Sequence, residues 1–170
     1  MVHRERNDME TKTGIEQLLR EGNTICVMPE GYSMYPMLVP GRDSVIIEPL
    51  CVLNGERQRA GEKPVLRGDV VLYRRDAGIL VLHRVFHVRK DGYYMVGDNQ
   101  TRVEGPLRGD QLRGRMVGFI RRGRYCSTKD LPYRVYAALW LLARPLRHKI
   151  AITVHFFKER RKRAKQTPDQ

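Results

Sequence analysis

The chain of 170 residues is long enough for one compact domain with some excess, and too short for two full domains. Hydrophobic residues make up 41% of it and charged residues 30%, which excludes wholesale disorder. The net charge of +13 indicates an anionic partner, either nucleic acid or an acidic membrane surface, or else serves solubility.

The three cysteines are Cys26, Cys51 and Cys126. Their odd number and wide spacing argue against a disulfide framework, and the lack of a paired Cys/His motif argues against a structural zinc site. Cys26 and Cys126 have small or apolar neighbours, which predicts that both are packing residues.

The beginning of the chain, residues 1–14, is polar and charged, so no secretory signal is predicted. No run of about 18 apolar residues occurs, so no conventional spanning helix is predicted either. We therefore expect a cytoplasmic or a peripheral, membrane-associated protein.

The expected elements begin with a short helix over residues 8–21, in which Ile15, Leu18 and Leu19 form an apolar stripe and which Gly22 ends. Strands follow at 24–28, 43–50, 69–75, 79–89, 92–97 and 112–121. Residues 76–78 and 90–92 are hairpin turns between them, and residues 52–68 are a loop. From residue 131 to 165 the apolar spacing becomes helical, with a break or kink at Pro145.

These short, closely spaced strands predict a mainly β fold, a coiled antiparallel sheet or partly open barrel, with a helical C-terminal extension. The chain divides into an N-terminal helical segment over residues 1–22, a β domain over 23–126 and a basic amphipathic helical tail over 127–170.

A serine in a glycine-containing turn is the first candidate for chemistry. Ser33 follows the strand at 24–28 and lies two positions after Gly31. A nucleophilic serine needs an exposed hydroxyl and a backbone N–H aimed at the substrate carbonyl, and a sharp turn out of a strand supplies both. Met34 would then point into the core. The alternative is that Ser33 caps a short helix.

A histidine within an apolar strand is the candidate base. His83 lies between Leu82 and Arg84, and a histidine with a pKa near neutrality suits the activation of serine. The alternative is a half-buried histidine with its hydrogen bonds satisfied. His87 is a rival base, because strand alternation places it on the same face.

A carboxylate at a strand end is the candidate third member. Asp98 follows Gly97, and it is suited to orient the imidazole and stabilise its charged form. An ordinary Asx turn is the alternative explanation. Other acids that remain open for this role are Asp69, Asp91 and Asp110.

Four motifs occur in a specific order along the predicted β domain. They are Gly-Tyr-Ser-Met-Tyr-Pro-Met-Leu at 31–38, followed by Gly41 and Asp43; Gly-Asp-Val-Val at 68–71; His-Arg-Val at 83–85; and Gly-Asp-Asn at 97–99. Together they resemble the type I signal peptidase family. Bacterial members of the common kind carry a lysine base, as do the LexA-type repressor peptidases that share the fold. The His83–Arg84 pair is similar to the histidine branch of the endoplasmic reticulum and archaea.

The resemblance implies a serine endopeptidase with the coiled β-sheet of the signal peptidase and LexA peptidase type. It implies Ser33 as nucleophile, His83 as general base and Asp98 as the acidic partner, with the Ser33 backbone N–H in the oxyanion hole. Gly31 stands where some relatives carry a hydroxyl donor to that hole. Family substrates are leader or signal segments with small residues before the cleaved bond, bound as an extended strand. No metal or cofactor is implied.

Typical family members carry a spanning helix before the serine, and none is predicted before Ser33; the C-terminal tail is the candidate substitute for that anchor. Residues 133–157 mix aromatic and aliphatic residues with basic ones, and residues 158–165 are almost all charged. This composition suits a helix that lies in an anionic membrane interface across 133–165. The alternative is a helix packed on its own β domain.

A second class of function stays open, namely a non-catalytic basic module that binds nucleic acid or anionic lipid on a peptidase fold. No helix-turn-helix pattern precedes the β domain, and aromatics do not alternate with basic residues as on RNA-binding sheets. Nucleic acid is therefore the less favoured partner.

Overall fold

The computed structural model describes residues 14–50, 52–53, 56–57 and 64–144. Residues 14–20 are helical. The strands are β1 (Ile25–Val27), β2 (Asp43–Pro49), β3 (Val52–Leu53), β4 (Glu56–Arg57), β5 (Val70–Arg74), β6 (Leu80–Arg89), β7 (Gly92–Val96), β8 (Glu104–Leu107), β9 (Leu112–Arg121) and β10 (Arg124–Ser127). A short 3₁₀ helix η1 (Gly109–Gln111) precedes β9, and the helix α2 (Leu131–Leu142) follows β10.

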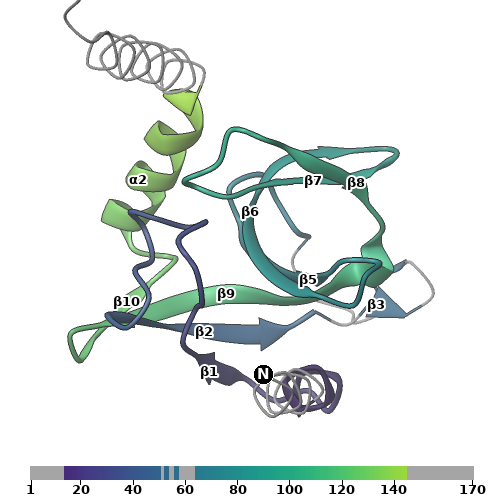
Figure 1. Ribbon diagram of the computed structural model, residues 1–170, viewed down its shortest axis with the longest axis horizontal. Coiled ribbons are helices and arrows are strands. Elements are labelled where there is room, and N and C mark those ends of the chain that lie inside the picture. Colours follow the sequence, from purple (N-terminus) through teal and green to yellow (C-terminus); the bar gives the residue numbers. More distant parts are fainter. Residues whose placement is uncertain (1–13, 51, 54–55, 58–63, 145–170) are drawn as a thin grey trace, which may run out of the picture.

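Eight of the strands form one antiparallel sheet in the order β1-β2-β9-β5-β6-β7-β8, with β10 paired to β9 outside this path. The sheet curls strongly through β5 to β8 without closing, and α2 stands beside the end of β9 to which β10 is paired (Figure 1). The predicted mainly β fold with a C-terminal helix is therefore confirmed. β1 lies at one edge of the sheet, which leaves one side of its backbone without a partner strand among the described residues.

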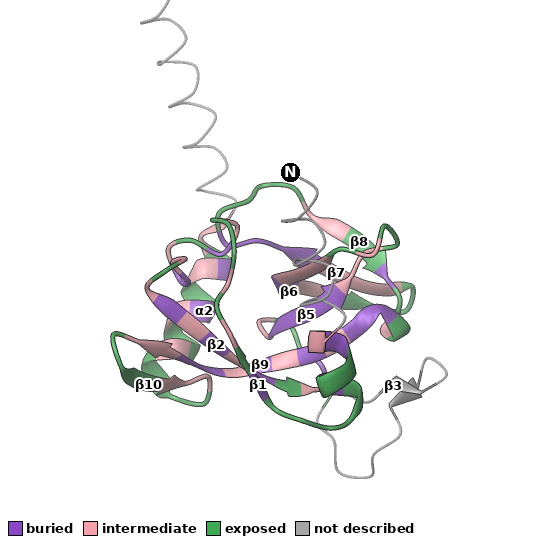
Figure 2. Cartoon of the chain, turned by 60° about the horizontal axis from the view of Figure 1, so that its bottom comes forward, coloured by how far each residue is buried: buried purple, intermediate pink, exposed green. Residues whose placement is uncertain are grey.

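The central strand β5 is buried on both faces. Val70 and Leu72 pack in one apolar cluster with Met34 and Leu38, whereas Val71 and Tyr73 pack in a second cluster on the opposite face. Along β2 and β9, buried and partly exposed residues alternate, as expected for strands with one face toward the core (Figure 2). The alternation shows which residues of β2 and β9 face the interior.

The predicted strands are observed within one or two residues, and a hairpin turn links β5 to β6 as expected. β8 and β10 were not predicted, because β8 contains the strand breakers Gly105 and Pro106 and β10 is only 4 residues long. The β3–β4 hairpin lies in the predicted loop. Residues 1–13 and the tail from residue 145 onward lie outside the described residues, as does Cys51.

The prediction that both described cysteines are packing residues is half correct. Cys126 is partly buried against the first apolar cluster, as expected. Cys26 is exposed, because it points away from the core in the edge strand β1. Within the described part of the chain, no helix has the length and apolar character that crossing a membrane requires.

A buried aspartate ties the segment after Ser33 to the sheet. Asp43 begins β2, is 1% exposed, and accepts hydrogen bonds from Arg42 Nε at 2.9 Å, from Arg121 Nε at 3.0 Å and from the Val39 N–H at 2.9 Å. Burial alone would raise the pKa of this carboxyl, but the hydrogen bonds from Arg42 and Arg121 outweigh it and lower the pKa to about 2.

We expect Asp43→Asn to lower the free energy of unfolding by about 2 kcal/mol at pH 7, since the folded-state pKa lies below the ordinary value near 3.9. A depressed carboxyl pKa contributes its full stability above the unfolded-state pKa and loses it as the pH falls through the folded-state pKa. The difference between wild type and variant should therefore shrink from pH 5 toward pH 2 in urea unfolding. A difference that is the same at pH 7 and pH 2.5 would contradict this account, and Asp76→Asn at an exposed ion pair is the control.

Candidate active site

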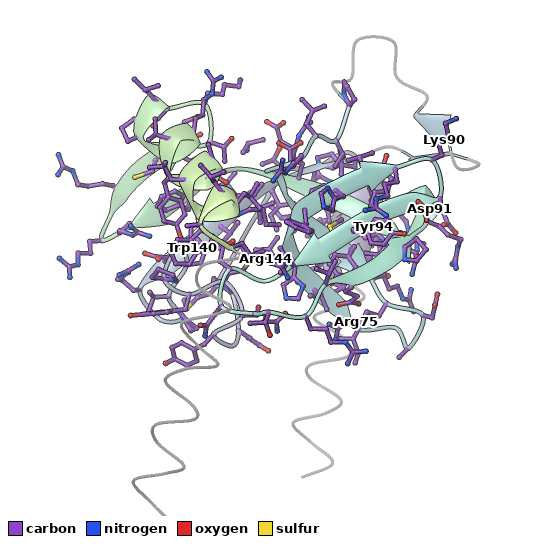
Figure 3. All side chains as sticks on the ribbon, turned by 90° about the horizontal axis from the view of Figure 1, so that it is seen from above. Arg75, Lys90, Asp91, Tyr94, Trp140 and Arg144 are labelled. Carbon is purple, nitrogen blue, oxygen red and sulfur yellow. The ribbon has the colours of Figure 1, made fainter. Side chains whose placement is uncertain are left out.

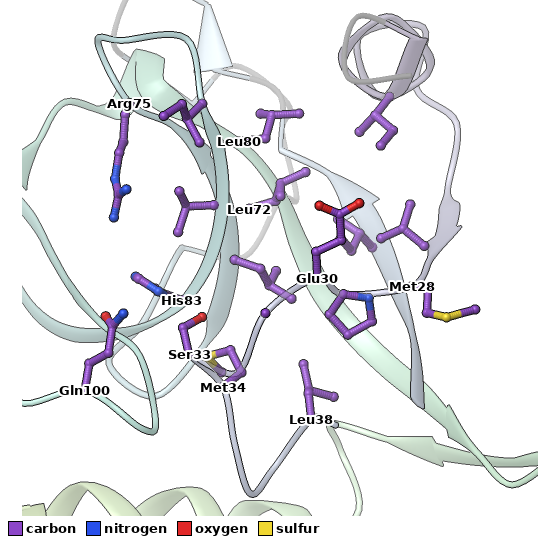
Figure 4. Close-up of a pocket in the computed structure, with 18 residues that line it drawn as sticks. Met28, Glu30, Ser33, Met34, Leu38, Leu72, Arg75, Leu80, His83 and Gln100 are labelled. Atoms are coloured by element: carbon purple, nitrogen blue, oxygen red, sulfur yellow. The ribbon is translucent and has the colours of Figure 1, made fainter. Parts of the chain in front are cut away.

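A pocket of about 620 Å³ opens where the turn after β1 meets β5 and β6. Both Ser33 and His83 line it, and in Figure 4 their side chains lie next to one another. Its apolar wall is formed by leucines and other aliphatic residues, among them Leu38, Leu72 and Leu80. The pocket thus combines a hydroxyl, an imidazole and an apolar surface.

Ser33 lies in the turn that the sequence predicted. The chain leaves β1, reverses at Gly31 with a φ of 73°, which favours glycine, and reaches Ser33 half-buried. Met34 is 3% exposed and packs in the core, as expected. Residues 33–37 form turns, with a bond from the Tyr35 N–H to the Tyr32 carbonyl at 3.1 Å, and no helix begins at Ser33 in the described chain. The helix-cap alternative is therefore not observed.

The Gly-Asp-Asn motif holds the backbone of Ser33. The Asn99 N–H donates to the Ser33 carbonyl at 2.8 Å. A Cβ at Gly97 would lie 2.7 Å from the same carbonyl oxygen, which is closer than real Cβ contacts allow. Two motifs far apart in the sequence therefore meet at Ser33, and this close approach of the backbone requires a glycine at position 97.

His83 lies on β6 opposite Val71 of β5 and is 2% exposed. Its Nδ1 atom is 3.1 Å from the hydroxyl of Tyr73, the diagonal neighbour of His83 across the β5–β6 pair. Burial lowers the pKa of His83 to about 4, so the ring is neutral at pH 7.

The hydroxyl of Tyr73 also donates to Glu104 Oε2 at 2.8 Å. Glu104, at the start of β8, is held by Arg75 through Nε and Nη2, each at 2.6 Å. Hydrogen bonds from Arg75 lower the pKa of Glu104, while burial, reinforced by Glu104, raises the pKa of Tyr73. The sequence analysis missed Tyr73, Arg75 and Glu104 as site residues.

Asp98 is buried beside Arg84, with which it forms a two-point ion pair at 2.8 Å and 2.7 Å. The two side chains are 1% and 0% exposed. The structure thus places Asp98 as the partner of Arg84, and it places Tyr73 at the imidazole Nδ1, where the sequence analysis expected the acid.

α2 covers the Arg84–Asp98 pair, since Trp140 donates to the Asp98 carbonyl at 3.2 Å and the Tyr133 hydroxyl accepts from Arg84 at 3.2 Å.

The other acids considered for the third position have partners elsewhere. Asp91 accepts from Tyr94 at 2.6 Å, Asp69 from the Leu66 N–H at 2.9 Å, and Asp110 from Arg108 at 3.1 Å.

The rival base His87 does not line the pocket. The β6–β7 register shifts between Val85 and His87, and this irregularity interrupts the alternation on which the expected shared face depended. The His87 ring packs against Phe86 with ring centres 4.1 Å apart. His83 is therefore the histidine that faces Ser33.

Comparisons of the chain with family models, with curated proteins and with solved structures found no match.

Proposed function

We propose that this chain is a serine endopeptidase of the signal-peptidase type, with Ser33 as nucleophile and His83 as general base. The observation that carries the proposal is that Ser33 lies in one pocket with a buried, neutral histidine whose Nδ1 is already hydrogen-bonded. A fold alone does not require this combination of groups.

The proposed reaction is acyl transfer. Ser33 Oγ attacks the peptide carbonyl carbon while His83 takes the hydroxyl proton, and the Ser33 backbone N–H donates to the oxyanion. Collapse of the tetrahedral intermediate breaks the C–N bond, and the proton on His83 passes to the leaving amine. Water, deprotonated by His83, then hydrolyses the acyl-enzyme and regenerates the hydroxyl of Ser33.

The proposed substrate is an extended peptide with small residues before the cleaved bond, such as a leader or signal segment. β1 is an edge strand that leads directly into the turn of Ser33, so a peptide added along this edge would reach the nucleophile. Residues 28–31 after β1 line the pocket, which supports this path.

The proposed location is an anionic membrane surface. α2 exposes four aliphatic side chains at helical spacing, namely Leu131, Val135, Leu139 and Leu142, which are 70%, 47%, 58% and 74% exposed. The basic residues of 158–165 follow this helix in the sequence. An apolar helix face next to a basic cluster suits the interface of anionic lipid.

The experiment that tests the proposal is cleavage of an extended-peptide library, with and without anionic vesicles, and mass-spectrometric identification of the products. The blank is the double variant Ser33→Ala/His83→Ala purified in the same way. We expect the wild type alone to cleave after small residues, and vesicles to raise the rate if the tail binds lipid.

Cleavage by the blank as well would mean that a contaminating protease produced the fragments. No cleavage by the wild type under either condition would contradict the proposed endopeptidase and favour the non-catalytic binding module. Salt-dependent binding of the intact protein to DNA, RNA or vesicles would then distinguish the partners of that module.

A further inference from the structure

A chain of hydrogen bonds runs from the imidazole of His83 into the sheet. It passes from His83 Nδ1 to the Tyr73 hydroxyl at 3.1 Å, from that hydroxyl to Glu104 Oε2 at 2.8 Å, and from Glu104 to Arg75 at 2.6 Å. Its members come from β6, β5 and β8 and from the residue after β5. In Figure 4, Arg75 extends over the same pocket that His83 lines.

The direction of each hydrogen bond follows from the chemistry of the groups. An ionised carboxylate only accepts hydrogen bonds, and a tyrosine hydroxyl has a single proton to donate. Tyr73 gives that proton to Glu104, so toward His83 its oxygen can only accept. The Nδ1 atom of His83 must therefore carry the imidazole proton, which leaves the lone pair on Nε2.

Glu104 remains the acceptor at the end of this chain because Arg75 holds both of its oxygens. A two-point contact with a guanidinium fixes the plane of the carboxylate and favours its ionised form. The ionised Glu104 therefore fixes the direction of both hydrogen bonds of Tyr73. This direction in turn places the imidazole proton on Nδ1.

We propose that Tyr73 is a positioning residue that sets the tautomer of His83, with Glu104 as the anion that the hydroxyl connects to the ring. The inference rests on the proposed function, in which His83 is the base. When the proton of Ser33 Oγ passes to Nε2, the proton on Nδ1 stays in place and the Tyr73 proton stays on its oxygen. The positive charge of the imidazolium then faces Glu104 across one polarised hydroxyl.

Tyr73→Phe removes the hydroxyl and keeps the ring, so the fold is expected to persist. We expect kcat/KM for peptide cleavage to fall about 10- to 100-fold through kcat, with KM nearly unchanged, because orientation of the base contributes to the transition state. The matched control is Tyr94→Phe, which also deletes a tyrosine–carboxylate hydrogen bond on this sheet, but at the exposed pair Tyr94–Asp91 (Figure 3). It should cleave at the wild-type rate.

Glu104→Gln gives a second test, of the charge alone. Oε2 accepts hydrogen bonds from both Tyr73 and Arg75 Nη2, so in the variant the amide oxygen is expected to take this place, because an amide NH2 there would face the Arg75 donor. Tyr73 then keeps its direction and Nδ1 keeps its proton, while the anion that faces the imidazolium is lost. We therefore expect a fall in kcat of about 10-fold.

The decisive readout is the ¹⁵N NMR signature of the His83 ring in the free protein, assigned by comparison with His83→Gln. We expect the Nδ1–H form in the wild type and in Glu104→Gln, and a mixture of the two tautomers in Tyr73→Phe. An Nε2–H ring in the wild type, or an unchanged tautomer and rate in Tyr73→Phe, would overturn the inference.

The two readouts separate the failures. A wild type that cleaves peptides but holds the wrong tautomer refutes the role of Tyr73 and keeps the peptidase. A wild type that holds the Nδ1–H form and cleaves nothing in the library refutes the peptidase. It then also refutes a catalytic role for the chain of hydrogen bonds from His83 to Arg75.

Discussion

Replacing either Ser33 or His83 by alanine is expected to lower kcat/KM for peptide cleavage by at least about 10³-fold. Under the proposed mechanism, Ser33→Ala removes the oxygen that forms the acyl bond, and His83→Ala removes the base that lines the same pocket. Because the two groups act in one step, the double variant should lose no more than either single variant.

The same proposal sets the pH dependence of the wild type. Only the neutral ring accepts a proton, and burial lowers the pKa of His83 to about 4. The rate constant kcat/KM should therefore rise with a midpoint near pH 4 and stay level through pH 7, since this parameter reports the free enzyme.

Ser127→Ala, a serine of β10, is the control for purification and folding. Additive losses in the double variant, or a midpoint near 6.5 in the wild type, would contradict the coupled, buried pair.

Local patterns predicted the turn that contains Ser33, the strand that contains His83 and most of the sheet. The turn at Gly31, the apolar neighbours of His83 and the hairpin at residues 76–78 each depend on a few adjacent residues, and the structure retains all of them. These features are local, so a sequence contains enough information for them.

The hydrogen bonds that connect His83 to Tyr73 and Glu104 were not predicted, because they depend on contacts between segments that are distant in the sequence. Glu104 contacts Tyr73 only because residues 104–107 form β8. The sequence Glu-Gly-Pro-Leu of that strand does not predict a strand, since it contains glycine and proline. The irregularity between Val85 and His87 is likewise absent from the local pattern. The strand-end position and the family resemblance indicated Asp98 as the acid beside the imidazole, whereas the sheet register brings Glu104 toward the ring through Tyr73.

Arg84 has the most completely buried charge in the described chain and the largest expected effect on stability. It is 0% exposed and donates to both oxygens of Asp98, to the Gly68 carbonyl at 2.9 Å and to the Tyr133 hydroxyl at 3.2 Å. It therefore joins β6, the loop before β5 and α2 to the loop whose Asn99 holds Ser33.

We expect Arg84→Met to lower the free energy of unfolding by about 3–5 kcal/mol in urea titrations followed by circular dichroism, because it leaves the Asp98 carboxylate buried without its counter-ion. Arg108→Met, at ion pairs in which the arginine side chain is 64% exposed, should cost less than about 1 kcal/mol. Arg84→Lys should fall between them, since it keeps the charge and loses the two-point contact.

The double variant Arg84→Met/Asp98→Asn separates charge burial from packing. If the uncompensated carboxylate is what destabilises Arg84→Met, neutralising it restores part of the loss, although four hydrogen bonds of the guanidinium remain absent. If the double variant is no more stable than Arg84→Met, the loss comes from packing and hydrogen bonds alone. The loop that contains Asp98 also fixes the Ser33 carbonyl through Asn99. A folded Arg84→Met protein should therefore cleave more slowly than its loss of stability explains. A wild-type kcat in the folded fraction would show that Ser33 is positioned independently of the Arg84–Asp98 pair.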